Sequence, residues 1–115
     1  MRITRVANYH ELSVLAADHI VKAVKDKPDL LFCAATGGSP TGMYAEMTKE
    51  KDVFKQMRVI KMDEWGIIPS IHPDSCESYL QKHLLGPMEI PANRYVSFDP
   101  NSAETEKEIQ RVESY

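Results

Sequence analysis

The stretch that decides the fold is Leu30-Leu31-Phe32-Cys33-Ala34-Ala35-Thr36-Gly37-Gly38-Ser39-Pro40. It begins with a short, continuous apolar run, which is typical of a strand buried on both faces of a parallel sheet. The run passes directly into a glycine pair, a serine and a proline, which favour the first turn of a helix. The stretch therefore predicts a strand, a tight turn and a helix in immediate succession, with Ser39 as the helix cap.

Elements of the same two kinds alternate along the rest of the chain. Residues 2–6 alternate as a short edge strand does, and further strands are expected over residues 58–62 and 95–98. Asn8 and Glu11 form a capping-box pair that predicts a helix start. The apolar face expected for that helix comprises Leu12, Leu15, Ala16, His19, Ile20, Ala23 and Val24.

Two more helices are expected in the second half. Asp74 and Glu77 make a second capping-box pair, in front of a helix that ends at Gly86-Pro87, and Ser102 is the expected cap of a last helix. Strands that alternate with helices imply βαβ units with right-handed crossovers. We therefore expect an α/β fold with a Rossmann-like, doubly wound, mainly parallel sheet. The last helix has no stop signal before Tyr115, so we expect the sheet to be truncated at the carboxyl end.

Composition excludes several classes of function. A length of 115 residues fits one domain, and the net charge of −3 comes without a cluster of Lys or Arg, so neither nucleic acid nor a membrane is an expected partner. The longest apolar stretch, residues 30–35, is far too short to span a bilayer. Cys33 and Cys76 form no disulfide framework, and the chain opens without a secretory signal, so a cytoplasmic location is expected. The four histidines lack metal-like spacing, so no metal and no cofactor are expected.

The loop of Thr36, Gly37, Gly38 and Ser39 is a candidate phosphate site. A glycine pair between a strand and a helix start leaves backbone N–H groups and the positive end of the helix dipole facing one concavity. An ordinary tight turn between strand and helix is the alternative. The motif of nucleoside triphosphatases is excluded because Met43 and Tyr44 stand where its Lys and Ser or Thr belong. The glycine spacing also misses the dinucleotide pattern, so a small phosphorylated molecule is the expected ligand.

A second motif, Lys61-Met62-Asp63-Glu64-Trp65, follows the next predicted strand. Ligands of open parallel sheets bind beyond the carboxyl ends of the strands, where Asp63 and Glu64 fall. A carboxylate beside a bound sugar phosphate can move a proton between adjacent carbons, as aldose–ketose isomerisation requires. A solvated loop is the alternative for this pair. Cys76 and His83 share one side of a predicted helix, but no third group orients them for nucleophilic catalysis.

These motifs resemble the glucosamine-6-phosphate deaminase and galactosamine-6-phosphate isomerase family. The resemblance rests on residues 35–41, on Met62-Asp63-Glu64-Trp65 and on residues 72–80. It implies that Asp63 is the general base that moves a proton from C2 to C1, before ammonia leaves C2 and a keto-hexose 6-phosphate is released. It also implies that residues 36–39 hold the phosphate. Tyrosine usually follows the acidic pair in the glucosamine branch, so Trp65 favours the galactosamine branch.

The resemblance further implies that residues 1–115 are the amino-terminal half of one sugar-phosphate isomerase domain. The family's ring-opening histidine and further basic phosphate ligands lie downstream of this sequence. The 115-residue chain alone is therefore expected to be inactive, and the full-length parent is expected to be active. Members of the family often assemble, which makes a homo-oligomer an expected state. Two alternatives stay open. One is 6-phosphogluconolactonase, where arginine typically follows the acidic pair, and the other is a non-catalytic sugar-phosphate sensor such as the effector domain of SorC-type regulators.

Overall fold

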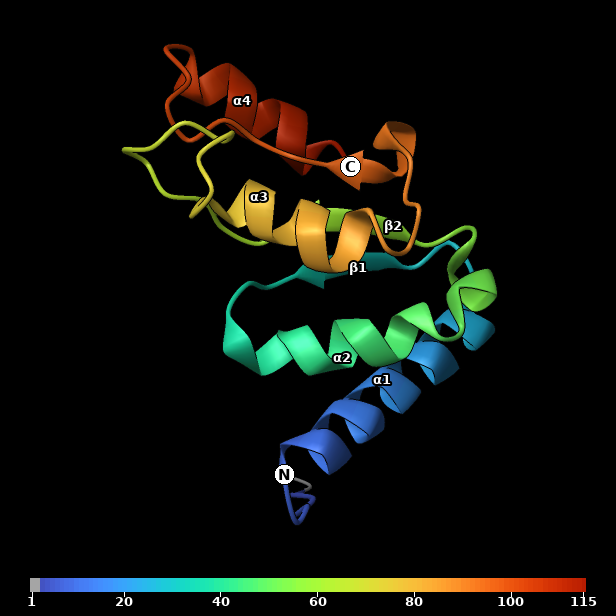
Figure 1. Cartoon of the computed structure of the whole chain (residues 1–115). Helices are drawn as coiled ribbons and strands as arrows, with labels where there is room; N and C mark the ends of the chain where they lie inside the picture. Colours follow the sequence, from blue (N-terminus) through green and yellow to red (C-terminus); the bar gives the residue numbers. More distant parts are fainter. Residues whose placement is uncertain (1–2) are drawn as a thin grey trace.

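The computed structural model describes residues 3–115 and has a three-stranded parallel sheet at its centre, in the order β1-β2-β3 (Figure 1). The strands are β1 (Leu31–Ala34), β2 (Arg58–Lys61) and β3 (Tyr95–Val96). In the register, Ala34 of β1 pairs with Lys61 of β2. The predicted α/β class and parallel sheet are therefore confirmed, and both loops singled out by the sequence leave the sheet at one end.

The helices alternate with the strands. They are α1 (Tyr9–Asp26), α2 (Gly38–Thr48), α3 (Cys76–Leu80) and α4 (Thr105–Glu113), with the short 3-10 segments η1 (Lys51–Phe54) and η3 (Ala92–Arg94). Helix α3 continues without a break into the π-helical segment η2 (Gln81–Leu85), which ends directly before Gly86-Pro87, as predicted. In Figure 1, α2 and the α3–η2 segment lie beside the strands, and α1 packs on the far side of α2.

The core lies between one face of the sheet and these helices. Its largest fully buried apolar side chains are Tyr44, Phe54, Met47, Met57, Leu80, Leu84, Val24 and Val59. The other face is less covered by the described residues, because Cys33 is exposed and Leu31 and Ile60 are only half-buried. The prediction that residues 30–34 are buried on both faces is therefore wrong for the face that carries Cys33.

The amino-terminal segment differs from the sequence prediction. Residues 3–6 form no strand and are exposed, and Arg2 lies outside the described residues. This segment pairs with neither outer strand of the described sheet, and an isolated strand lacks the ladder of hydrogen bonds that stabilises it. Helix α1 does start as predicted: Asn8 Oδ1 accepts from the Glu11 N–H at 2.9 Å, and the Glu11 carboxylate accepts from the Ala7 N–H at 2.9 Å.

The inward face of helix α1 matches the predicted apolar face only in part, because Val24 is buried and Ile20 packs against the core, but His19 is exposed. Its buried residues are Ser13, Ala17, Val21 and Val24, whereas Leu12 is 47% exposed. The reason is close contact between α1 and α2 at small residues: a Cβ on Gly42 would lie 2.2 Å from Ser13 Oγ. Within residues 3–115, no helix has both the length and the apolar character needed to cross a bilayer.

Two predicted helix caps are also wrong. Helix α3 is capped by Ser75 and not by Asp74: Ser75 Oγ accepts from the Ser78 N–H at 3.0 Å. Helix α4 begins two residues later than a Ser102 cap requires, at Thr105, because Ser102 instead accepts from the Glu104 N–H in the preceding turn at 3.2 Å. Side-chain oxygens a residue or two apart compete for the same free N–H groups, so sequence patterns leave the choice between them open.

Candidate active site

The glycine loop connects β1 to α2 and presents backbone donors. Gly37 occupies the N-cap position with φ of 104°, in the left-handed region that glycine adopts without strain. Gly38 and Ser39 are the first two residues of α2, so their N–H groups have no acceptor within the helix and lie at the positive end of its dipole. The prediction that Ser39 caps this helix is wrong, since the cap is Gly37. The two N–H donors expected of this loop are nevertheless present.

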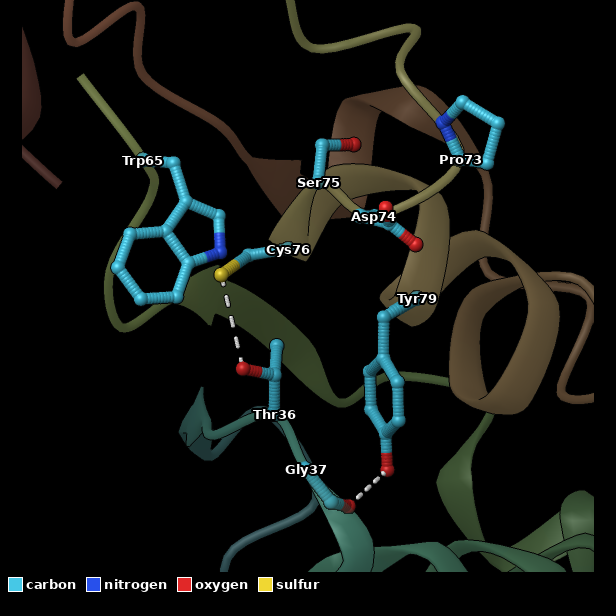
Figure 2. Close-up of a pocket in the computed structure, with 8 residues that line it drawn as sticks. All are labelled: Thr36, Gly37, Trp65, Pro73, Asp74, Ser75, Cys76 and Tyr79. Carbon is cyan, nitrogen blue, oxygen red and sulfur yellow. Dashed lines mark hydrogen bonds between the residues drawn. The ribbon is translucent and has the colours of Figure 1, made fainter. Parts of the chain in front are cut away.

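A pocket of about 310 Å³ opens beside this loop (Figure 2). It is lined by Thr36, Gly37, Trp65, Pro73, Asp74, Ser75, Cys76 and Tyr79. Figure 2 shows Thr36 and Gly37 on one side, the start of α3 on the other, and the Trp65 indole as a side wall. The structure thus joins the loop, the segment after β2 and the start of α3 around one space. Thr36 and Gly37 line this pocket, and Gly38 and Ser39 follow them at the start of α2.

Asp63 stands at the matching position on the neighbouring strand. Ala34 and Lys61 are paired, so Thr36 and Asp63 each lie two residues beyond the same rung of the sheet, and the Met62 N–H donates to Ala34 O at 3.1 Å. Asp63 is exposed. Its carboxylate lies close enough to Cys76, a pocket residue, to contribute to the raised pKa of that thiol. The structure therefore brings Asp63 and the glycine loop to one edge of the sheet.

Cys76 forms part of the pocket wall as a neutral thiol. Burial, together with the negative charges of Asp63 and Glu64, raises its pKa despite a contact with Thr36, whose Oγ1 lies 3.5 Å from Sγ. His83, seven residues away, packs its ring against Tyr79 with centroids 4.6 Å apart. A thiol with a raised pKa is a poor nucleophile at neutral pH. This geometry agrees with the expectation that Cys76 and His83 do not form a nucleophile–base pair.

Glu64 is the best-anchored residue of the acidic pair. Its side chain has no solvent-exposed surface, and its carboxylate accepts from the Cys76 and Glu77 N–H groups, both at 2.8 Å. The Glu64 carboxylate also accepts from the Trp65 N–H and from Lys61 Nζ, both at 3.0 Å. Burial alone would raise the pKa of Glu64, but these four donors outweigh it and lower the pKa to about 2. Glu64 is thus an anion at neutral pH and ties the end of β2 to the first turn of α3.

A second carboxylate completes this buried network. Glu77 Oε2 lies 3.4 Å from Lys61 Nζ and accepts from the hydroxyls of Tyr95 at 2.8 Å and Ser97 at 2.9 Å. Burial raises the pKa of Glu77, but hydrogen bonds from Gln81, Tyr95 and Ser97 and the charge of Lys61 lower it overall. The network therefore joins β2, α3 and the residues of β3 and after it, and it holds the segment that carries Asp63 in place.

The sequence did not predict which member of the acidic pair is buried and which is exposed. Glu64 is buried and accepts four hydrogen bonds, whereas Asp63 is exposed to solvent. Sequence reasoning did not place Cys76, Asp74 and Tyr79 in the pocket, although residues 72–80 are part of the stretch on which the family resemblance rests. Among the described residues, no group of three or more His, Cys, Asp or Glu side chains is arranged to hold a metal ion. The site can present N–H donors to an anion and a carboxylate to a neighbouring carbon.

Comparison with known proteins finds glucosamine-6-phosphate deaminases among the chains that are similar in sequence. No family model matches the chain. A glucosamine-6-phosphate deaminase of Geobacillus sp. (strain WCH70) is 33% identical over 120 residues, which cover 98% of this chain and 47% of that protein. A glucosamine-6-phosphate deaminase of Clostridium perfringens (strain 13 / Type A) is 32% identical over 106 residues, which cover 88% of this chain and 43% of that protein.

The fold matches a solved structure as well. A monomeric glucosamine-6-phosphate deaminase of the NagB superfamily superposes with a TM-score of 0.88 at 26% sequence identity, covering 99% of this chain and 49% of that one. The similarity in sequence and in fold thus extends over nearly the whole chain. The chain spans about half the length of the curated relatives that it matches.

Proposed function

We propose that this chain, a homologue of glucosamine-6-phosphate deaminases over nearly its whole length, carries the phosphate loop and the proton-transferring carboxylate of a hexosamine 6-phosphate deaminase. The observation that carries the proposal is the placement of Thr36 and Asp63 two residues beyond one paired rung of the sheet. The sugar phosphate is the partner, and residues 36–39 bind its phosphate through backbone N–H groups.

Asp63 acts on the open-chain sugar. Its carboxylate removes the proton from C2, and the electrons of the C–H bond form a C1–C2 double bond. The electrons of the C1=O double bond move to O1, which takes a proton from solvent, and an enol results. Return of the proton to C1 gives an imine at C2. Water adds to that imine, ammonia leaves C2, and a keto-hexose 6-phosphate remains. The exposed position of Asp63 suits a base that must reach a substrate carbon, whereas the bonded position of Glu64 does not.

The finer assignments rest on the sequence motifs. We propose that residues 1–115 are the amino-terminal half of one isomerase domain and that the rest of the protein supplies ring opening and cationic phosphate ligands. No Lys or Arg lines the described pocket, which fits a site completed from elsewhere. Trp65 stands where the glucosamine branch usually has tyrosine, and this resemblance favours galactosamine 6-phosphate over glucosamine 6-phosphate. A cytoplasmic location and assembly into a homo-oligomer are part of the same proposal.

Two other functions are weighed against this one. A 6-phosphogluconolactonase would use the same loop, but the indole of Trp65 stands where that family typically has arginine. A sugar-phosphate sensor would need the loop and the pocket but no base, which would leave the exposed Asp63 without a role. Both are separated from the deaminase by their products, since neither releases ammonia.

The test is product identification. Full-length protein is incubated with glucosamine 6-phosphate and with galactosamine 6-phosphate, and ammonia and keto-hexose 6-phosphate are measured. We expect equal amounts of the two products, with the faster rate on galactosamine 6-phosphate, and no turnover by the 115-residue chain alone. Ammonia from neither substrate would defeat the proposal. Faster release from glucosamine 6-phosphate would overturn only the assignment to the galactosamine branch.

A further inference from the structure

Three tyrosine hydroxyls from three different helices bond to the carbonyl oxygens of the glycine loop. Tyr44 of α2 donates to Ala35 O at 2.7 Å. Tyr79 of α3 donates to Gly37 O at 2.7 Å, as Figure 2 shows, and Tyr9 of α1 donates to Gly38 O at 2.6 Å. The sequence prediction gave none of these three helical tyrosines a role in the site.

Each of these bonds sets the direction of a backbone donor. The peptide unit is planar and trans, so the N–H of the following residue points away from the carbonyl oxygen. The carbonyls of Ala35, Gly37 and Gly38 therefore fix the N–H groups of the residues after them, which are Thr36, Gly38 and Ser39. Those three N–H groups belong to the predicted phosphate loop. The hydroxyls bond on the carbonyl side and leave the donor side of the loop open to an anion.

Tyr9 is built into the first turn of α2. Its hydroxyl donates to Gly38 O and accepts from the Gly42 N–H at 2.8 Å, so it bridges the two groups that would bond directly in a regular helix. A Cβ on Gly42 would lie 3.0 Å from Tyr9 Cε1 and 2.2 Å from Ser13 Oγ. Glycine at position 42 is thus what allows the ring of Tyr9 to approach this turn.

The other two tyrosines are held just as firmly. Tyr44 is fully buried, and burial raises its pKa, so its hydroxyl stays protonated and able to donate. Tyr79 OH lies 2.7 Å from Thr41 Oγ1, which itself donates to Gly37 O at 2.9 Å. Gly37, whose φ of 104° sets the turn, therefore has its carbonyl fixed from two sides.

We propose that Tyr9, Tyr44 and Tyr79 are positioning residues of the phosphate site, which fix the loop N–H groups in the orientation that binds the phosphate. This inference rests on the proposed function of the loop. A preorganised donor set binds an anion more tightly because the backbone has less freedom to lose on binding. Tyr9 and Tyr44 lie outside the pocket lining and act only through the loop, whereas Tyr79 also lines the pocket. Loss of one of these hydroxyls therefore weakens phosphate binding and leaves the proton transfer at Asp63 unchanged, and Tyr9 and Tyr44 test the positioning role apart from direct contact.

The test removes one hydroxyl at a time. Tyr9→Phe, Tyr44→Phe and Tyr79→Phe are made in the full-length protein, with Tyr115→Phe, an exposed tyrosine outside the pocket lining, as the matched control. Calorimetry measures Kd for inorganic phosphate and for fructose 6-phosphate, kinetics give kcat and KM, and circular dichroism reports folding. Loss of one preorganising hydrogen bond is expected to raise Kd and KM roughly 3- to 10-fold, with kcat changed less than roughly 2-fold.

Each outcome decides one question. Higher Kd and KM with steady kcat in the folded variants, and no change in Tyr115→Phe, support the positioning role. Unchanged phosphate affinity in folded Tyr9→Phe and Tyr79→Phe overturns it. Failure of all three variants to fold also overturns it, because the hydroxyls would then serve the fold itself. If unaltered protein binds neither phosphate nor fructose 6-phosphate, the proposed function fails first, which separates the two hypotheses.

Discussion

Replacing Glu64 by glutamine tests the claim that this residue supports the site without taking part in chemistry. The carboxylate accepts four hydrogen bonds, two on each oxygen: Oε1 from the Trp65 and Cys76 N–H groups, and Oε2 from the Glu77 N–H and Lys61 Nζ. A glutamine side chain has one acceptor oxygen and one NH₂ group. In either orientation of the amide, the NH₂ group would face two donors and could accept a hydrogen bond from neither.

The size of the effect follows from burial. Lys61 Nζ would keep one carboxylate within ion-pair distance, that of Glu77 at 3.4 Å, and the side chain of Lys61 has no exposed surface. Removing one partner of a buried ion pair costs about 3–5 kcal/mol, since the other charge stays buried. We therefore expect Glu64→Gln to lower the free energy of unfolding by about 3–5 kcal/mol, and to lower activity through displacement of the Asp63 segment.

The same residue makes stability depend on pH. The pKa of Glu64 is lowered to about 2 in the folded protein, from 4.5 ordinarily. A lowered folded-state pKa contributes stability that is complete above the ordinary pKa and is lost as pH falls through the folded-state value. Stability should therefore decline between about pH 4.5 and pH 2, by an amount on the order of 3 kcal/mol from this residue. Glu64→Gln should show a flatter decline, because the titrating group is gone.

Urea unfolding of the full-length protein between pH 7 and pH 3 measures both effects. The matched control is Asp52→Asn, which removes a carboxylate that is 83% exposed and paired with Lys55. An exposed pair contributes little, so no measurable shift is expected from the control. If Glu64→Gln unfolded at the same urea concentration as the unaltered protein at pH 7, the reasoning about this network would be refuted.

Two more predictions follow from packing and burial. Gly42→Ala should lower the free energy of unfolding by about 1–3 kcal/mol, because its Cβ would lie 2.2 Å from Ser13 Oγ and push α1 away from α2. Adding Ser13→Gly should restore part of that loss. An unchanged melting temperature of Gly42→Ala would contradict the contact. Iodoacetamide at neutral pH should modify exposed Cys33 well before buried Cys76, as peptide mass spectrometry would show; the reverse order would contradict the raised pKa of Cys76.

Much of the fold could be predicted because local signals agreed with one another. The run before Gly37 and the run before Asp63 are both strands, and each ends two residues before the polar residue that opens its motif, Thr36 or Asp63. Strand ends in a parallel sheet share one edge, so the meeting of the two loops follows from order alone. The capping pair at Asn8 and Glu11 also had no local competitor.

The rest depends on contacts that a single sequence does not reveal. Apolar periodicity favours Leu12 for burial, yet Ser13 and Ala17 are buried because α2 approaches closely at Gly42. The sequence pattern predicts that Glu77 forms a capping box with Asp74, but its carboxylate instead accepts a hydrogen bond from the hydroxyl of Tyr95 in β3. Tertiary contacts of this kind decide which of several competent side chains is used.

The most direct test of the central claim is proton transfer by Asp63. Full-length protein converts hexosamine 6-phosphate in D₂O, and mass spectrometry follows deuterium at C1 of the keto-hexose product, for unaltered protein and for Asp63→Asn. Asp74→Asn, a carboxylate on the pocket wall, serves as the comparison. We expect the unaltered protein to release ammonia and to place deuterium at C1 only in the fraction of turnovers in which the proton on Asp63 exchanges with D₂O before it returns, Asp63→Asn to fall at least roughly 100-fold in kcat, and Asp74→Asn to keep proton transfer. Ammonia release by Asp63→Asn at the unaltered rate would contradict the account.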